Sequence, residues 1–245
     1  MNLDRVTPGR NITDEMPVKR NNIDWQCLTD ADAIATRATE LILQAAASAV
    51  HKRGVFKLVL AGGRTPEKVY RHLAKAQADW DHWQLYFGDE RCLPSDHPDR
   101  NSQMAARSWL VQGQVPADHI HPIPAELGPA TAAQQYAGLV SQAQPFDMVM
   151  LGIGEDGHTA SLFPGQSFPS DESVHAVHGA PKPPAERVSL SAAALSDSRD
   201  VLVLVTGRGK RKAVRQWQQG ADLPIARITA RQRVTVLLDA AAAQT

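Results

Sequence analysis

The segment with the clearest potential for proton transfer is rich in glycine and holds one acid and one histidine. Gly152, Gly154 and Gly157 fall within six residues, and Asp156 and His158 lie on either side of Gly157. Histidine titrates near neutral pH, so it can take a proton from water and return it. A carboxylate beside it can fix its tautomer, although residues two positions apart need not face each other. An isolated histidine is more often structural, but its place in this loop predicts a catalytic pair, with His158 as the base and Asp156 as its support.

The same glycines also match, formally, the Gly-x-Gly-x-x-Gly fingerprint of dinucleotide-binding loops. That fingerprint requires a helix directly after the loop and an acidic residue about 20 positions further along the chain. Neither feature is evident after Gly157. The sequence therefore does not predict a bound dinucleotide.

A second segment predicts contact with an anion. An apolar run ends at Gly62-Gly63, and Thr65-Pro66 then opens a helical pattern. Glycines let the backbone come close to an anion, and the free N–H groups of a helix N-terminus carry partial positive charge. Thr65 can bond a phosphate oxygen or cap the helix, and a simple tight turn explains the pattern equally well. Gly62, Gly63 and Thr65 are therefore candidate phosphate-binding residues.

Charged residues at the ends of other apolar runs supply candidate cations. Asp89, Glu90 and Arg91 follow one run, and because three charges are costly to pack within a sheet, we expect them to face solvent or a site. The planar fork of Arg91 matches phosphate or carboxylate oxygens. Asp89 and Glu90 could orient that fork or act on substrate protons, and an ion pair within a solvated turn is the alternative. Lys210, in a turn after a further run, is placed to reach an anion, and Arg187 is a weaker candidate.

The elements that carry these motifs alternate between strands and helices. A helix capped by Thr29 or Asp30 is predicted to run to about His51. Apolar runs predict strands at 57–61, 84–87, 147–151, 187–190, 200–205 and 233–239, and helical patterns lie at 65–76, 101–110, 130–141 and 207–219. Such strands predict an α/β fold, with a mostly parallel sheet and helices on both faces. Ligands bind at the carboxyl ends of such strands, where the motifs above lie.

The domain organisation is predicted to be simple. Residues 23–245 form a single α/β domain, and residues 1–22, which lack hydrophobic periodicity, are a polar N-terminal extension. Residues 166–186, rich in proline, serine and charge, are predicted to be a long surface excursion of that domain.

The charge balance and hydropathy of the sequence argue against nucleic acids and membranes as binding partners. The 26 lysines and arginines balance 26 aspartates and glutamates, which argues against a nucleic-acid binder. No apolar stretch reaches the roughly 20 residues that span a bilayer, and the N-terminal residues do not resemble a signal peptide. We therefore predict a cytoplasmic protein without membrane contact. The two cysteines, Cys27 and Cys92, are far apart, and the loops lack the spacing of zinc ligands, so no metal is predicted.

Taken together, the motifs resemble those of the 6-phosphogluconolactonases of the pentose phosphate pathway. The similarity covers most of residues 25–240 and rests on four ordered motifs, at 62–66, 89–101, 152–165 and 207–210, of which the third is the most specific. Arg64 departs from the family, which more often has serine there, and Arg100 stands where serine usually precedes the asparagine.

The resemblance implies a Rossmann-like fold and hydrolysis of the sugar-phosphate lactone 6-phospho-D-glucono-1,5-lactone, without metal or organic cofactor. It implies that His158 is the general base and that Arg91, Lys210 and residues 62–65 hold the phosphate. A cation or backbone N–H groups would stabilise the oxyanion, and which cation serves which group is left open. We expect a monomer or a weak homo-oligomer.

Two alternatives differ in function. The glucosamine-6-phosphate deaminases share the fold and a similar Asp-Gly-His motif, but they carry a glutamate that assists ring opening where this chain has Phe163, and a tyrosine where it has Arg91. A phenylalanine cannot move a proton, so a lactonase is favoured. A non-catalytic sugar-phosphate sensor would commonly carry a DNA-binding domain, for which residues 1–22 are too short.

Overall fold

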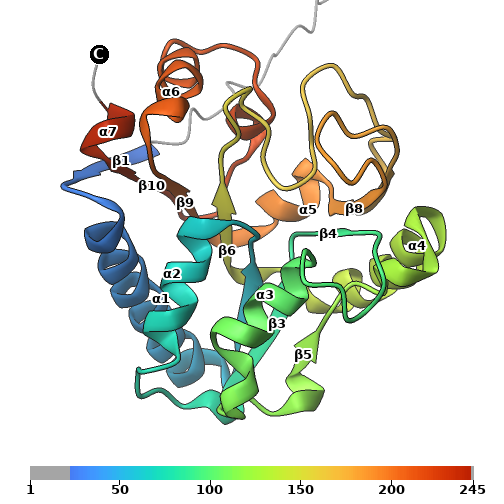
Figure 1. Ribbon diagram of the computed structural model, residues 1–245. Helices are drawn as coiled ribbons and strands as arrows, with labels where there is room; N and C mark the ends of the chain where they lie inside the picture. The colour runs from blue at the N-terminus through green and yellow to red at the C-terminus, as the bar shows by residue number, and fades with distance from the viewer. Residues whose placement is uncertain (1–22, 244–245) are drawn as a thin grey trace, which may run out of the picture.

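Seven strands form one parallel sheet at the centre of the molecule (Figure 1). The computed structural model describes residues 23–243, so the predicted extension over residues 1–22 lies outside the described residues. Every neighbouring pair of strands in this sheet is parallel. In spatial order the strands are β1 (Ile23–Leu28), β10 (Arg233–Asp239), β9 (Ser198–Val205), β6 (Phe146–Gly152), β2 (Phe56–Leu60), β3 (Trp83–Phe87) and β5 (Ile120–His121).

Within the described residues, six α-helices cover the two faces of this sheet. They are α1 (Ala31–Arg53), α2 (Arg64–Leu73), α3 (Asn101–Ser108), α4 (Pro129–Ala143), α5 (Ala192–Ser196) and α6 (Arg211–Gln218); a short α7 (Ala240–Ala243) follows β10. Connections between parallel strands are right-handed. The crossovers through α1, α2 and α3 run along the sheet in one direction, and those through α4, α5 and α6 run in the other, so the two sets lie on opposite faces (Figure 1). The predicted sheet with helices on both faces is confirmed.

Helix α1 shows how the sequence sets these elements. The Asp30 side chain accepts hydrogen bonds of 2.9 Å from the N–H groups of Asp32 and Ala33, which confirms Asp30 as the N-cap. At the other end Gly54 adopts φ 74°, the left-handed conformation that terminates helices. Its apolar face, which includes Ile34 and Ile42, is fully buried against the sheet.

A second, smaller sheet corrects two expectations. Strands β4 (Asp89–Arg91), β8 (Arg187–Leu190) and β7 (Val174–Val177) pair antiparallel. The predicted surface excursion therefore contains a strand, whose His175 is 4% exposed and stacks on Phe168. The expectation that all three charges of 89–91 face solvent or a site is also wrong. Glu90 is completely buried, because backbone N–H groups satisfy its carboxylate, as described below.

The direction of the chain along the sheet reverses between β6 and β2. From β2 the chain passes to β3 and β5 on one side, and from β6 to β9 and β10 on the other. At such a switch point the loops after the two strands diverge and leave a crevice at the carboxyl edge of the sheet. The loops after β2 and β6 are the two glycine-containing segments singled out above. Within residues 23–243, no helix is long and apolar enough to cross a membrane.

Candidate active site

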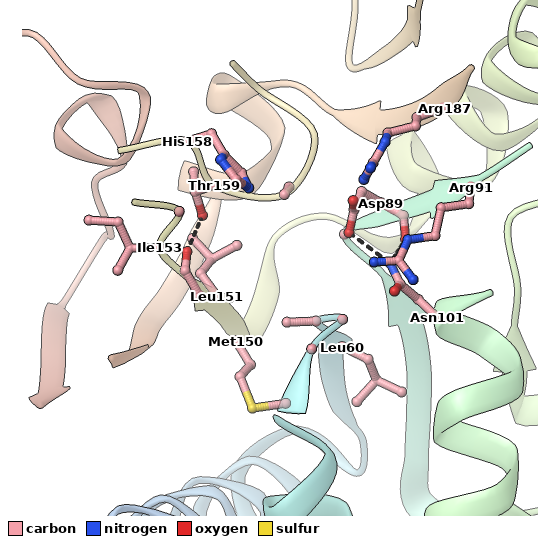
Figure 2. A pocket seen from close by; sticks show the side chains of 17 residues that line it. Leu60, Asp89, Arg91, Asn101, Met150, Leu151, Ile153, His158, Thr159 and Arg187 are labelled. Atoms are coloured by element: carbon pink, nitrogen blue, oxygen red, sulfur yellow. Dashed lines mark hydrogen bonds between the residues drawn. The ribbon is translucent and has the colours of Figure 1, made fainter. Parts of the chain in front are cut away.

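Two adjoining cavities open at this switch point. A cavity of about 190 Å³ is lined by the ends of β2, β4 and β6 and includes His158, and Figure 2 shows its side chains. A larger cavity of about 500 Å³ is lined by the start of α2 and the end of β9 and includes Lys210. We call them the histidine cavity and the lysine cavity. The two cavities share four lining residues, Gly62, Gly63, Gly152 and Ile153. One extended ligand can therefore occupy both cavities.

His158 and Asp156 form a hydrogen-bonded pair. The Nδ1 atom of His158 lies 2.5 Å from Oδ1 of Asp156, and the same oxygen accepts the His158 backbone N–H at 3.2 Å. A carboxylate on Nδ1 holds the proton on that nitrogen and leaves Nε2 with a free lone pair. The imidazole side chain is 17% exposed and lines the histidine cavity. The predicted pair is therefore in contact, with one nitrogen available as a base.

Glycines make this pair sterically feasible. A Cβ atom at Gly154 would lie 2.0 Å from Nδ1 of His158 and 2.4 Å from Oδ1 of Asp156, where no side chain fits. Gly157, between the pair, has φ 85°, in the left-handed region that other residues rarely adopt. The Gly154 N–H then donates to the His158 carbonyl at 2.7 Å and closes the loop. Asp156 and His158 face each other because of this tight turn.

The surroundings of His158 favour its neutral form. Burial lowers the pKa of His158 and outweighs the hydrogen bond and charge of Asp156, which raise it. Part of that burial comes from Phe163, which is 3% exposed and whose ring centroid lies 4.6 Å from that of the imidazole. For Asp156, burial acts to raise the pKa, but the hydrogen bonds and charge of His158 prevail and the pKa is lowered. A neutral imidazole beside an ionised carboxylate is the state that a general base requires.

Asp89 is held by a buried network on the opposite wall of the histidine cavity (Figure 2). Its Oδ1 accepts a hydrogen bond of 3.0 Å from Nδ2 of Asn101, and its Oδ2 accepts one of 2.6 Å from Oγ of Ser161. The Asn101 side chain approaches the β2 loop so closely that a Cβ at Gly62 would lie 2.1 Å from Oδ1 of Asn101. Asn101 and Ser161 were not among the predicted site residues, although both lie inside the quoted motifs.

Glu90 and Arg91, next in the chain, point in different directions. The Glu90 carboxylate accepts the backbone N–H groups of Asn101 at 2.7 Å and Ser102 at 2.8 Å, so it caps the N-terminus of α3. Arg91 lines the histidine cavity, and its Nη1 donates to the Asp99 carbonyl. Glu90 is therefore structural, whereas Arg91 stays a candidate for binding the ligand.

Arg100, one of the two departures from the family pattern, has a structural role, as Glu90 does. Its side chain is 3% exposed and donates hydrogen bonds of 2.7 Å to the Ile123 carbonyl and to Glu126. It lines neither the histidine cavity nor the lysine cavity. This departure therefore leaves the lining of both cavities unchanged.

The lysine cavity collects the predicted phosphate-binding residues 62–65 and Lys210, whereas Arg91 lines the histidine cavity. Helix α2 begins at Arg64 with Gly63 as its N-cap, so Thr65 does not cap the helix as one expectation held. Instead Oγ1 of Thr65 lies 2.7 Å from Oγ1 of Thr206, at the end of β9. Lys210 faces the same cavity, and burial lowers its pKa while the charge of Glu155 opposes that shift. Arg64, the second departure, adds a cation to this lining.

Arg187 borders the histidine cavity but uses most of its donors elsewhere. Its Nε and Nη2 atoms donate to backbone carbonyls of residues 182–184 at 3.0 Å, and Nη1 lies 3.4 Å from Oγ of Ser161. The side chain is buried, with the guanidinium carbon 5.7 Å from the centre of the Phe163 ring. Its predicted contact with substrate stays a prediction.

The structure thus brings the candidate residues together at one edge of the sheet. Asp89, Arg91, Arg187 and His158 border the histidine cavity, Thr65 and Lys210 border the lysine cavity, and Gly62 and Gly63 border both. Asp156 joins them through its hydrogen bond to His158. In the part of the chain that the structure describes, no group of three or more histidine, cysteine, aspartate or glutamate side chains is arranged to hold a metal ion.

Comparison with known proteins identifies the family. The model of the glucosamine-6-phosphate isomerases/6-phosphogluconolactonase family matches residues 29–237. The chain belongs to this family. The family that the motifs predicted is therefore confirmed, as is the fold class.

Two curated relatives and one solved structure are similar to this chain over nearly their whole length. A 6-phosphogluconolactonase of Mycobacterium tuberculosis is 35% identical over 233 residues, which cover 87% of this chain and 94% of the relative. One of Streptomyces coelicolor is 36% identical, covering 87% of this chain and 89% of the relative. The crystal structure of 6-phosphogluconolactonase from Thermotoga maritima matches with a TM-score of 0.83 at 26% identity, over 89% of this chain and 99% of that one.

A deaminase of known structure shares the architecture. A monomeric glucosamine-6-phosphate deaminase matches with a TM-score of 0.76 at 22% identity, over 90% of this chain and 99% of that one. At this level of identity the likeness concerns the fold alone. The choice between the two activities therefore depends on the residues of the site.

Proposed function

We propose that this chain hydrolyses 6-phospho-D-glucono-1,5-lactone to 6-phospho-D-gluconate in the oxidative pentose phosphate pathway. The observation that carries the proposal is the pair of His158 and Asp156 in a cavity that adjoins a cationic one. The names of the relatives support the same activity. Phe163 packs against His158 where the deaminase motif has a glutamate, so the proton carrier that ring opening requires is missing there.

The proposed reaction begins with the phosphate in the lysine cavity. Lys210, Thr65 and the N–H groups at the start of α2 surround that space and can hold a dianion. The lactone ring then extends past Gly62 and Gly152, which border both cavities, towards His158. Arg91 faces that end of the ligand, where it can stabilise negative charge on the lactone carbonyl oxygen.

Proton transfer follows from the state of His158. Nε2 takes a proton from a water molecule as its oxygen attacks C1 of the lactone, and Asp156 stabilises the imidazolium that forms. The bond between C1 and the ring oxygen then breaks, and the imidazolium returns its proton to that oxygen. The new carboxylic acid ionises, so each turnover releases one proton to the solution.

The test follows this acid release from freshly made 6-phosphogluconolactone at near-neutral pH, above the spontaneous rate. We expect His158→Ala to lower kcat by about 10²–10⁴-fold, the usual contribution of a positioned general base, while binding of 6-phosphogluconate is largely retained. His82→Ala is a matched control, because His82 forms a similar pair with Asp79, 2.9 Å apart on the surface. Full activity of His158→Ala would exclude this residue as the base.

Substrate preference tests the phosphate half of the proposal. We expect unphosphorylated gluconolactone to be a poor substrate, because it leaves the cations of the lysine cavity unpaired. Glucosamine 6-phosphate is offered in the same series, and ammonia release is measured. Efficient deamination, or equal turnover of the two lactones, would contradict the proposed activity.

A further inference from the structure

The segment between β7 and β8 is fastened to the wall of the histidine cavity. Its ends are joined by a hydrogen bond of 2.9 Å from the Ala180 N–H to the Ala185 carbonyl. Arg187 is 6% exposed as a residue, and its guanidinium donates to three successive carbonyls at 3.0 Å each: Nη2 to residues 182 and 183, and Nε to residue 184. Because Arg187 also borders the histidine cavity, this clamp places the backbone of Lys182 beside the site.

The Lys182 side chain is an exposed cation with no structural partner. Within residues 23–243 its ammonium forms no ion pair, whereas Lys68, at the lysine cavity, lies 2.5 Å from Asp32. The Lys182 charge is among those that lower the pKa of His158 and the pKa of Lys210. Arg187 borders the histidine cavity and holds the Lys182 backbone at 3.0 Å. The exposed Lys182 side chain is therefore free to turn towards an anion bound at the site.

We propose that Lys182 is a substrate-binding residue that holds the phosphate group together with Lys210. Arg187 is the positioning residue, because it holds the backbone of Lys182 beside the site. A sugar phosphate carries close to two negative charges at neutral pH, whereas the lactone ring is neutral. Two lysines that repel each other in the free protein are both stabilised when a dianion lies between them. The flexible stem of lysine lets its ammonium follow the ligand.

This inference rests on the proposed function only for the identity of the ligand, so its test uses binding as well as turnover. The affinity for 6-phosphogluconate and for gluconate is measured by calorimetry for the unchanged chain and for Lys182→Met. We expect about tenfold weaker binding of 6-phosphogluconate and about tenfold higher KM for the phosphorylated lactone, as for the loss of one charge-assisted hydrogen bond. Binding of gluconate should not change, and Lys182→Arg should retain the affinity.

Two comparisons separate this role from a general effect of charge or folding. Lys212→Met removes the same charge from an exposed position on α6, outside both cavities, and should leave affinity and KM unchanged. Asp156 and Asp89 raise the pKa of His158, and Lys182 lowers it. Lys182→Met should therefore move the acidic limb of the kcat/KM profile to higher pH.

Each outcome is decisive. If Lys182→Met and Lys212→Met bind 6-phosphogluconate equally well, the assignment of Lys182 is overturned. Equal losses for gluconate and 6-phosphogluconate would overturn its contact with phosphate. Failure of the unchanged chain to hydrolyse the lactone, with 6-phosphogluconate still bound through Lys182, would refute the proposed reaction and leave this inference standing.

Discussion

Asp156→Asn tests whether the carboxylate beside His158 contributes to catalysis. The substitution keeps the size of the side chain and removes its charge, which faces Nδ1 at 2.5 Å. As His158 takes a proton, the ionised Asp156 stabilises the imidazolium, an interaction worth about 1.5–3 kcal/mol for a charge-assisted hydrogen bond. The Asp156 side chain is 37% exposed, so solvent screening places the value at the lower end of that range. A loss of about 1.5 kcal/mol corresponds to a roughly tenfold lower kcat.

The pH dependence gives this prediction a sign. Asp156 raises the pKa of His158 through its hydrogen bond and its charge, against the larger effect of burial. Its neutralisation should therefore lower that pKa further, and the acidic limb of the kcat/KM profile should move to lower pH. The assay is initial-rate acid release across the pH range, with Asp79→Asn beside the surface His82 as the control. Unchanged kcat, or a limb that moves to higher pH, would refute the argued coupling.

Two further predictions concern neighbours of the site. Glu90→Gln should lower the free energy of unfolding by about 1–3 kcal/mol, because the buried carboxylate accepts the N–H groups of Asn101 and Ser102 at the start of α3. Urea denaturation measures this change. A free energy of unfolding within about 0.5 kcal/mol of that of the unchanged chain would contradict the capping role. Phe163→Leu should lower the free energy of unfolding by about 1–2 kcal/mol. It should also move the acidic limb of the kcat/KM profile to higher pH, because burial is what lowers the pKa of His158. A profile whose acidic limb stays in place would show that the Phe163 ring does not contribute to that burial.

The apolar runs predicted the parallel sheet and five of its seven strands within residues 23–243, and they missed β1 and β5. Strands such as Val201–Val205 are buried on both faces, so their composition is close to continuous and marks them without any knowledge of the fold. In the second sheet, β8 was predicted from its apolar run at 187–190, whereas β4 and β7 carry no such signal. Asp89 and Glu90 are charged, and their burial depends on partners at positions 101, 102 and 161 that only the folded chain brings near. The residues next to a charged side chain in the sequence do not show that hydrogen-bond donors from distant positions will satisfy it in the folded chain.

The same limit applies to the candidate site. The loop of His158 was predictable because its glycines and its two titratable residues are contiguous in the chain. Whether Asp156 meets His158 depends on the left-handed turn at Gly157 and on the space left by Gly154, which a spacing of two residues does not reveal. Arg187 was predicted as a ligand contact, and its bonds to three carbonyls of its own loop became visible only in the folded structure.

The order of strands explains how motifs far apart in the chain can act on a single substrate molecule. The loops after β2 and β6 leave the sheet at its switch point. The predicted anion-binding loop at Gly62 and the histidine loop at Gly154 are therefore neighbours, although they lie far apart in the chain. Each loop requires glycine for a different reason: Gly62 makes room for Asn101, and Gly154 makes room for the pair of His158 and Asp156. The phosphate would hold the substrate at one loop while the other acts on the lactone. Binding and proton transfer depend on loops that follow different strands. A change in the position of one loop relative to the other should therefore lower kcat even where the affinity for 6-phosphogluconate is retained.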